Sequence, residues 1–215
     1  MKDELDNVTI DFLPVGFIAT HYQAVTPIPD HVVSGRRWNG SKTPDKIKND
    51  WMTPLYIVRY LELKQGSKFQ LDPAADAKSA KAEKYFTKFD DGLKQDWTDY
   101  QFIFVNPPYG DIMPWIEKAI QTVKAGKNIT IRMVLPSDIS TKWFRRAVIS
   151  CSEVIHLISD GKKSGRVAFL NPETGLEVGE NNKGTQIFTF TSKPKPTRTL
   201  YISRSDMEKS IEGSE

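Results

Sequence analysis

The stretch Ile103-Phe104-Val105-Asn106-Pro107-Pro108-Tyr109-Gly110 decides the expected fold. Ile, Phe and Val favour a β-strand, whereas two successive prolines lack amide donors and cannot continue a hydrogen-bonded ladder. The strand is therefore expected to end here and to deliver Asn106 and Tyr109 to a rigid loop. In open α/β sheets, ligands bind at the carboxyl edge of the strands, so this loop is a candidate site.

The Asn-Pro-Pro-Tyr run has the atoms needed to bind a planar amino group. The amide oxygen of Asn106 and the carbonyl of Pro107 are two acceptors held by stiff backbone, and Tyr109 offers a ring for stacking. Two acceptors on the hydrogens of an exocyclic NH2 group would localise the nitrogen lone pair and make the nitrogen a better nucleophile. A proline-rich turn with Tyr109 covering the core also explains these residues.

The composition is that of an ordinary globular protein, and 215 residues are enough for one substantial core. Hydrophobic residues make up 39% of the chain, and no apolar run is long enough to cross a bilayer, which excludes a membrane-spanning protein. The acidic N-terminus lacks the apolar core of a signal peptide, so we expect a cytoplasmic protein. The net charge of +3 is too small to indicate nucleic-acid binding by itself.

Metal-ligating residues are sparse. Cys151 is the only cysteine, which excludes an internal disulfide and a cysteine-based zinc site. The three histidines, His21, His31 and His156, are scattered and have no ligand spacing on one helix face. We therefore expect no metal.

Three regions are expected along the chain. Residues 1–50 form a loop-rich arm, residues 51–204 one α/β domain, and residues 205–215 a mobile tail. Within the arm, Arg36 and Arg37 stand beside an aromatic residue and glycines, a combination that suits contacts with nucleic-acid phosphates and bases. An ordinary solvated loop explains the same residues.

Alternating strand and helix patterns predict an α/β fold with a mostly parallel sheet and helices on both faces. Expected helices are 53–63 (with Thr53 as its cap), 77–84, 113–123 and 141–149. Expected parallel strands are 69–72, 85–88, 103–105, 129–135 and 154–158. Two later strands, 166–170 and 186–190, have no helix between them and predict an antiparallel C-terminal hairpin that completes the sheet.

Aspartates follow two of the expected strands, and the N-terminus of an expected helix comes before these strands in the sequence. Asp72 ends one strand, and Asp90 and Asp91 follow the next, where they would suit hydroxyl or amine donors of a nucleoside-like cofactor. Trp51 and Thr53 lie at a helix N-terminus, where free amides favour a carboxylate. Turn formation and helix capping are sufficient explanations for each of these residues alone.

Five segments in this order resemble the phage-type Dam family of DNA adenine-N6 methyltransferases: residues 51–54, 71–75, 89–93, 106–110 and 165–171. The resemblance spans about residues 51–190. It implies a Rossmann-like methyltransferase fold, S-adenosylmethionine as methyl donor, and a flipped-out adenine in double-stranded DNA as acceptor. It also implies a bacterial host cell, with a phage or mobile element as source and protection from restriction as a role.

For the donor, the resemblance assigns the first segment to its methionine part, the second to the donor-binding strand end, and the third to an acid near its ribose or adenine. The residues so assigned are Trp51, Thr53, Pro54, Asp72, Ala74, Asp90, Asp91 and Asn106. One departure stands out, because Ala74 and Ala75 occupy the place where many methyltransferases have a glycine-rich turn.

For the acceptor, the resemblance assigns catalysis to the fourth segment and places the fifth near the flipped base. The residues are Asn106, Pro107, Pro108 and Tyr109 for catalysis, and Tyr109, Arg166 and Phe169 for the base, with Arg36 and Arg37 as further DNA contacts. The arm before Asp50 and the loop 171–185 are the candidates for reading flanking bases. We expect a monomer or a weak dimer.

Two other functions remain open on the residues alone. An RNA base or a protein glutamine amide also presents a planar NH2 group, so either could be the acceptor. A DNA-binding module without catalysis is the second alternative, and it would bind DNA in a salt-dependent way and bind no methyl donor. Its phosphate contacts would be Arg36, Arg37, Lys142, Arg145 and Arg146.

Overall fold

The computed structural model describes residues 52–171, 174–178, 183–193 and 195–214. Its strands are β1 (Leu71–Asp72), β2 (Lys84–Tyr85), β3 (Phe102–Val105), β4 (Thr130–Pro136), β5 (Glu153–Ile158), β6 (Phe169–Leu170), β7 (Glu177–Val178), β8 (Thr185–Thr191) and β9 (Arg198–Ser203). Its helices are α2 (Leu55–Gln65), α3 (Met113–Ala125), α4 (Lys142–Val148) and α5 (Arg204–Glu212). The expected arm, including Arg36 and Arg37, and Trp51 lie outside the described residues.

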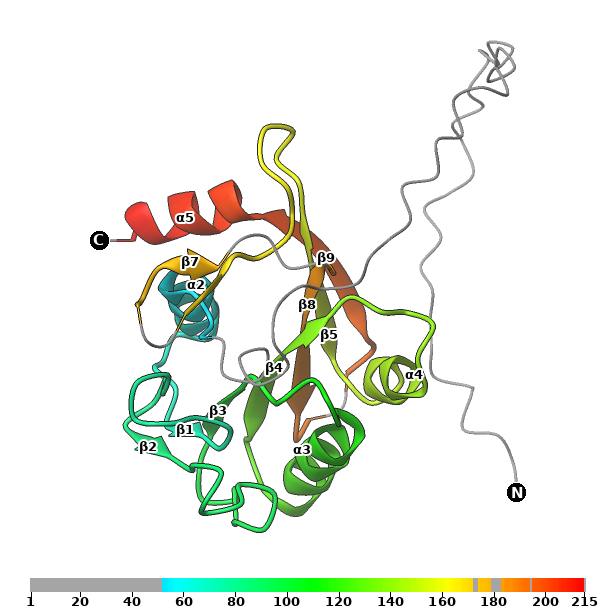
Figure 1. Ribbon diagram of the computed structural model, residues 1–215. Coiled ribbons are helices and arrows are strands. Elements are labelled where there is room, and N and C mark those ends of the chain that lie inside the picture. The colour runs from blue at the N-terminus through cyan, green and yellow to red at the C-terminus, as the bar shows by residue number, and fades with distance from the viewer. Residues whose placement is uncertain (1–51, 172–173, 179–182, 194, 215) are drawn as a thin grey trace, which may run out of the picture.

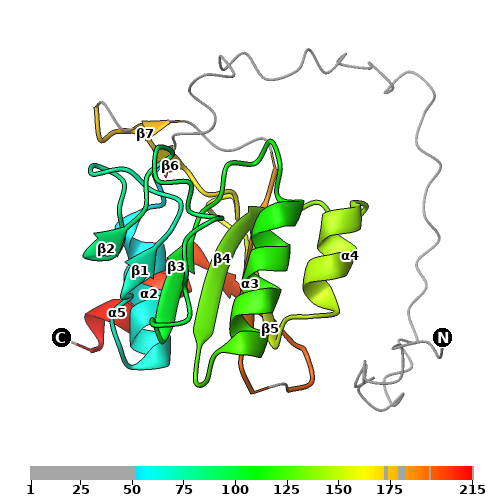
Figure 2. The same cartoon turned by 90° about the horizontal axis from the view of Figure 1, so that it is seen from below.

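A mixed sheet forms the centre of the described part, with seven strands in the order β2-β1-β3-β4-β8-β5-β9 (Figure 1). Strand β8 is antiparallel to both of its neighbours, and the other strands are parallel to one another. Helices α3 and α4 cover one face of the sheet, and α2 and α5 cover the other (Figure 2). The predicted fold class, a mostly parallel sheet with helices on both faces, is confirmed.

Strand β4 shows how the two faces are filled. Ile131 and Met133 pack into the cluster formed with α3 and α4, whereas Val134 packs into the cluster formed with α2 and α5. Because successive side chains of a strand point to opposite faces and helices cover both, β4 is buried along almost its whole length. The near-continuous apolar run at 129–135 has this cause.

The predicted C-terminal hairpin is wrong in its pairing. Phe169–Leu170 pairs with Glu177–Val178 in a separate two-stranded sheet, and β8 inserts between β4 and β5. Strand β8 is buried on both faces, with Ile187 packed in the cluster on the α2 face and Phe188 and Phe190 in the cluster on the α3 face, and a central position between covered strands offers that environment.

The predicted helix at 77–84 is absent. The carboxylate of Asp76 accepts hydrogen bonds from the amides of Lys78 (2.8 Å) and Ser79 (2.9 Å), and the Ser79 hydroxyl accepts one from the Asp76 amide. These bonds cap a first turn, which the Ala80 amide closes on the Asp76 carbonyl at 3.0 Å. The next amide, that of Lys81, donates to the Asp72 carboxylate instead of continuing a helical ladder, so the segment forms turns and leads into β2.

The segment expected to be a mobile tail is a helix, α5, preceded by a strand, β9, that the pattern did not predict. Ser203 and Asp206 form a reciprocal capping box at the start of α5, and Met207 is fully buried. The box and the buried methionine fix the helix against the α2 face.

Helix α4 begins after Thr141, the first residue of the predicted helix, and the Thr141 hydroxyl caps it by accepting a hydrogen bond from the Phe144 amide. Arg146, which the module without catalysis would use on phosphates, forms a two-pronged ion pair with Glu117 of α3. None of the helices in the described ranges has the length and apolar character needed to cross a bilayer.

Strand β1 lies between β2 and β3, the next two strands along the chain. The connections that leave β1 and β3 therefore diverge, and such a reversal of strand order opens a crevice at the carboxyl edge of an α/β sheet. The carboxyl edge of the sheet lies at the end where β3 leads into α3, and β6 and β7 are at the same end (Figure 2).

Candidate active site

Two of the predicted motifs meet at the carboxyl edge of β1 and β3. Strand β1 pairs with β3 at Leu71 and Ile103, so the loop after Asp72 and the loop that begins at Asn106 leave the sheet side by side. The sequence places these motifs 34 residues apart, and the parallel register joins them. The prediction that β3 ends at the Asn-Pro-Pro-Tyr run is confirmed.

The side chains of the Asn-Pro-Pro-Tyr loop are partly inside the protein. Asn106 is half-buried, and its amide oxygen is buried. Tyr109 packs against the cluster on the α3 face, and its buried hydroxyl has no hydrogen-bond partner among the described residues. Burial raises the pKa of Tyr109 far above its usual value, so the phenol stays neutral and keeps its proton as a donor.

Thr53 lies at the same edge because of two backbone hydrogen bonds. Met52 and Leu170 exchange them at 3.0 and 2.9 Å, which places the segment before α2 beside β6. The prediction that Thr53 caps α2 is wrong: the cap position is Pro54, in extended conformation, and no side chain caps the helix. The Thr53 hydroxyl is instead buried without a partner among the described residues.

The carboxylate of Asp72 holds its own loop. It is 3% exposed and accepts hydrogen bonds from the amides of Ala74 (3.3 Å) and Lys81 (3.0 Å). Burial raises the pKa of Asp72 to about 7, although both amides favour the ionised form. Both oxygens are engaged, so Asp72 shapes the loop that a ligand would meet. Lys81 acts through its backbone, which no side-chain pattern could reveal.

The two acids after β2 differ in their surroundings. Asp90 is exposed and accepts hydrogen bonds from the hydroxyl (2.7 Å) and amide (2.8 Å) of Thr87, which lower its pKa. Asp91 has a left-handed backbone, with φ of 54°, and its carboxylate forms a surface ion pair with Lys94 at 2.8 Å. Exposed ion pairs of this kind contribute little to the stability of the fold, and their side chains rearrange easily. Asp91 is therefore the acid that a ligand can recruit.

The loop carrying these acids is locked to the loop after β1. A Cβ atom at Gly92 would lie 1.9 Å from the carbonyl oxygen of Pro73, so only glycine permits this approach. The buried indole of Trp97 donates a hydrogen bond to the Gly92 carbonyl at 2.8 Å. Neither residue was predicted as part of the site. Gly92 and Trp97 are positioning residues that hold the two loops together.

The late segment is divided between surface and core. Arg166 is exposed, whereas Phe169 is 1% exposed and lies in the cluster that includes Ile57 and Val58 of α2. Thr185, at the start of β8, has a buried hydroxyl without a partner among the described residues, and no sequence signal singled it out. Within the same ranges, no three His, Cys, Asp or Glu side chains gather as a metal-binding group.

Comparisons with known proteins extend these observations. The family described as DNA N-6-adenine-methyltransferase (Dam) matches residues 40–213. The chain is 36% identical over 205 residues to the DNA N-6-adenine-methyltransferase of Escherichia phage T1, covering 87% of this chain and 85% of the relative. It is 32% identical over 171 residues to the protein of the same name from Haemophilus phage HP1 (strain HP1c1), covering 78% of this chain and 94% of the relative.

A solved structure from Vibrio vulnificus YJ016, the modification subunit assigned to a type I restriction enzyme, aligns with a TM-score of 0.40 and 13% identity, over 72% of this chain and 47% of that chain. The two phage relatives confirm the resemblance to the phage-type family. The family match contains all five predicted segments and most of the chain. The chain therefore belongs to the DNA N-6-adenine-methyltransferase (Dam) family.

Proposed function

We propose that this DNA adenine-N6 methyltransferase uses S-adenosylmethionine and presents a flipped-out adenine to it at the loop from Asn106 to Tyr109. One observation carries the proposal. The buried amide oxygen of Asn106 and the hydroxyl of Tyr109, which has no partner in the described part of the chain, follow β3 at the carboxyl edge, next to the loop after Asp72 on β1. A nucleotide base and a methyl donor can therefore be bound in adjacent positions.

The residues on the β1 side fit the donor. The hydroxyl of Thr53 is buried and unpaired among the described residues, as expected of a group that bonds to a polar ligand, here the methionine part. Trp51 and Pro54, from the same segment of the sequence, would border that part of the donor. Ala74 would border the donor through its backbone, and Asp91 or Asp90 would accept hydrogen bonds from the ribose hydroxyls. When bound, S-adenosylmethionine supplies a methyl group on a positively charged sulfur, so no protein nucleophile is required.

The residues on the β3 side fit the adenine. The Asn106 amide oxygen and the Pro107 carbonyl would accept hydrogen bonds from the two amino hydrogens, while Pro107 and Pro108 hold the backbone rigid. The Tyr109 ring would stack on the base and offset part of the cost of unstacking it from the duplex. The protein thus contributes orientation of the reactants and polarisation of the amine.

Three further features belong to the proposal. Arg166 is exposed at the same edge and would contact a phosphate, whereas Phe169 would support the late segment from the core. Arg36 and Arg37 would contribute DNA contacts from the arm. The enzyme would act on double-stranded DNA, without a metal, as a monomer or weak dimer.

The decisive experiment replaces Asn106 by Ala and follows labelled methyl transfer to DNA, RNA and protein in parallel. Asn106→Ala should lower the rate on DNA by at least about 10²-fold, because an acceptor aimed at the reacting amine is lost. Donor affinity, measured by calorimetry, should remain at the parental value. Asn106→Asp keeps an oxygen acceptor and should lose less activity.

Transfer to DNA by Asn106→Ala at the parental rate would remove Asn106 from the catalytic site. Label that appears on RNA or protein, and not on DNA, would identify a different acceptor for the same site. A purified protein that binds DNA but no donor would instead support the module without catalysis.

A further inference from the structure

The connection between β5 and β6 contains a turn that is ordered by its own side chains. The Ser159 hydroxyl donates to the Lys163 carbonyl (2.6 Å) and accepts from the Gly161 amide (3.0 Å). The carboxylate of Asp160 accepts from the amides of Lys162 (2.8 Å) and Lys163 (2.6 Å). Residues 159–163 therefore have a fixed backbone although they are exposed.

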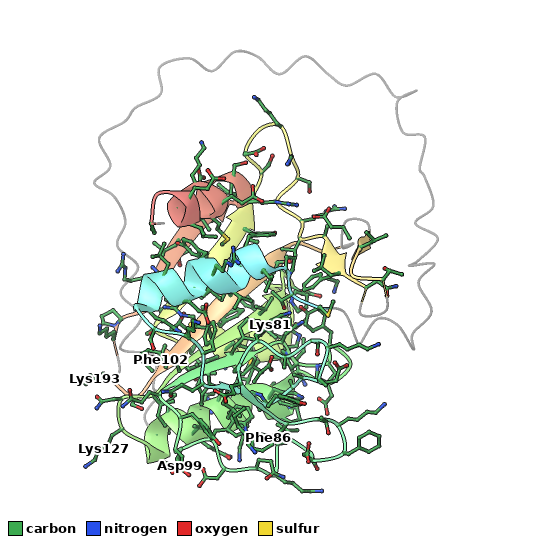
Figure 3. The ribbon with its side chains drawn as sticks, turned by 90° about the vertical axis from the view of Figure 1, so that its left-hand side faces the viewer. Lys81, Phe86, Asp99, Phe102, Lys127 and Lys193 are labelled. Atoms are coloured by element: carbon green, nitrogen blue, oxygen red, sulfur yellow. The ribbon has the colours of Figure 1, made fainter. Side chains whose placement is uncertain are left out.

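The turn is also fixed at its base and its side. A Cβ atom at Gly165 would lie 2.5 Å from the backbone carbon of Ile158, so the chain returns closely to the end of β5. The carboxylate of Asp160 also accepts a hydrogen bond from the hydroxyl of Ser205, in the first turn of α5. The loop between β5 and β6, yellow in Figure 1, projects from the body of the molecule, as it does in Figure 3.

This turn exposes positive charge. Lys162, Lys163 and Arg166 are exposed, while the acid among them, Asp160, has its carboxylate occupied by two amides and a hydroxyl. These hydrogen bonds hold the pKa of Asp160 well below its usual range, so the carboxylate is ionised and directed into the turn. The two lysine side chains are the groups that a partner would meet.

The position of the turn matches a duplex bound at the active site. Strand β5 is parallel to β3 and lies three strand positions from it, which at about 4.8 Å per strand is roughly 14 Å. The carboxyl ends of both strands are at the same edge. With a rise of about 3.4 Å per base pair, 14 Å corresponds to about four base pairs along DNA.

We propose that the turn held by Asp160 is a phosphate clamp: Lys162 and Lys163 contact the DNA backbone about four base pairs from the target adenine. The distance rests on the proposed placement of that adenine at Asn106. The clamp positions the duplex without reading its sequence, because phosphate contacts carry no base identity. It would supply affinity that weakens as salt concentration rises.

The test measures binding of duplex DNA of mixed sequence over a range of salt concentrations, with methyl transfer as a second readout. The variant Lys162→Ala/Lys163→Ala should bind DNA about tenfold more weakly, and the slope of log affinity against log salt should be less steep by about 1.8. Its KM for DNA should rise in parallel. Its kcat at saturating DNA and its donor affinity should stay at the parental values.

The matched control is Lys124→Ala/Lys127→Ala, which removes two exposed lysines from the opposite end of the sheet, where Lys127 is labelled in Figure 3. It should leave the salt slope unchanged. A parental slope in the Lys162→Ala/Lys163→Ala variant, or an equal loss in the control, overturns the clamp. Failure of the proposed function appears separately, in the activity of Asn106→Ala.

A second variant tests whether the order of the turn matters. Asp160→Ala removes a negative charge, which alone would strengthen DNA binding, but it also removes the hydrogen bonds that shape the turn. We expect DNA binding to weaken several-fold, with donor affinity unchanged. Tighter binding by this variant would contradict a clamp preformed by Asp160.

Discussion

The two edges of the central sheet treat buried polar groups in opposite ways. Toward the amino edge, Arg132 is 5% exposed, and its guanidinium contacts Gln65 at 3.0 Å, Thr189 at 3.1 Å and Glu153 at 3.5 Å. Lys64 adds a second cation to Glu153 at 3.2 Å. Every charge in this group is paired, and the group joins the end of α2 to three strands.

At the carboxyl edge, by contrast, the hydroxyls of Thr53, Tyr109 and Thr185 are buried and have no hydrogen-bond partner among the described residues. Folded proteins pair nearly all of their buried polar groups, and an unpaired one costs about 1–3 kcal/mol. The difference indicates that the amino edge is arranged for stability of the fold, and it supports the proposal that the carboxyl edge is arranged for polar groups brought by a ligand.

A substitution at Arg132 gives the largest expected effect and tests whether the amino edge stabilises the fold. Arg132→Met should lower the free energy of unfolding by about 3–5 kcal/mol, because it removes a buried guanidinium that bonds Gln65, Thr189 and Glu153 and leaves Lys64 as the remaining cation at Glu153. Urea unfolding measures this loss. At a temperature where the variant is folded, donor affinity should be parental, since the substitution is far from the carboxyl edge.

The double variant Arg132→Met/Glu153→Leu provides the control. It removes both charges and replaces them with apolar side chains, which is often close to neutral for a buried pair. Recovery of most of the lost stability is expected. If the double variant is no more stable than Arg132→Met, the lost packing around the arginine, and not the lost charge partner of Glu153, explains the lower stability.

Asp72 is a second test of the difference between the two edges. It lies at the carboxyl edge, and yet both of its carboxylate oxygens accept hydrogen bonds from backbone amides. Burial raises its pKa from 3.8 to about 7, so the folded protein holds the proton more tightly than the unfolded chain does. The resulting stabilisation is complete below pH 4 and is lost as the pH rises through 7. It amounts to at most about 4 kcal/mol.

Asp72→Asn replaces the acid by a neutral side chain and should remove this pH dependence. Unfolding free energies of the parent and the variant, measured by urea between pH 4 and 8, should converge or cross as the pH rises, because only the parent loses stability. Parallel profiles across this range would show that the carboxylate is solvated in the folded protein.

The features of the fold that the sequence predicted correctly depend on neighbouring residues. The end of β3 and the place of Asn106 follow from an apolar run and two prolines, which act on neighbouring residues alone. The central position of β8 depends on pairing with β4 and β5, which lie far away in the sequence. A sequence pattern indicates whether a strand is buried, but it does not indicate which strands pair with it. For this reason β8 was predicted to form a hairpin.

The site followed the same rule. The segment around Asp72 was predicted as part of the site, but its contacts with the Lys81 amide, and the contact of the Trp97 indole with Gly92, depend on how loops meet in space. The late segment identified the family, yet its pattern could not distinguish the buried Phe169 from the exposed Arg166. Identity of a motif does not fix the direction in which its side chains point.

The smallest expected effect, and the sharpest, comes from making one substitution at both edges. Thr53→Val removes an unpaired hydroxyl, so the protein without ligand should be equally stable or more stable by about 1 kcal/mol, while donor affinity falls several-fold. Thr189→Val removes an acceptor from Arg132 and should cost about 1–3 kcal/mol with donor affinity unchanged. Thermal melts with and without S-adenosylmethionine report both quantities. Equal destabilisation by the two variants would mean that the Thr53 hydroxyl is paired inside the protein. It would contradict the proposal that the carboxyl edge is arranged for a ligand.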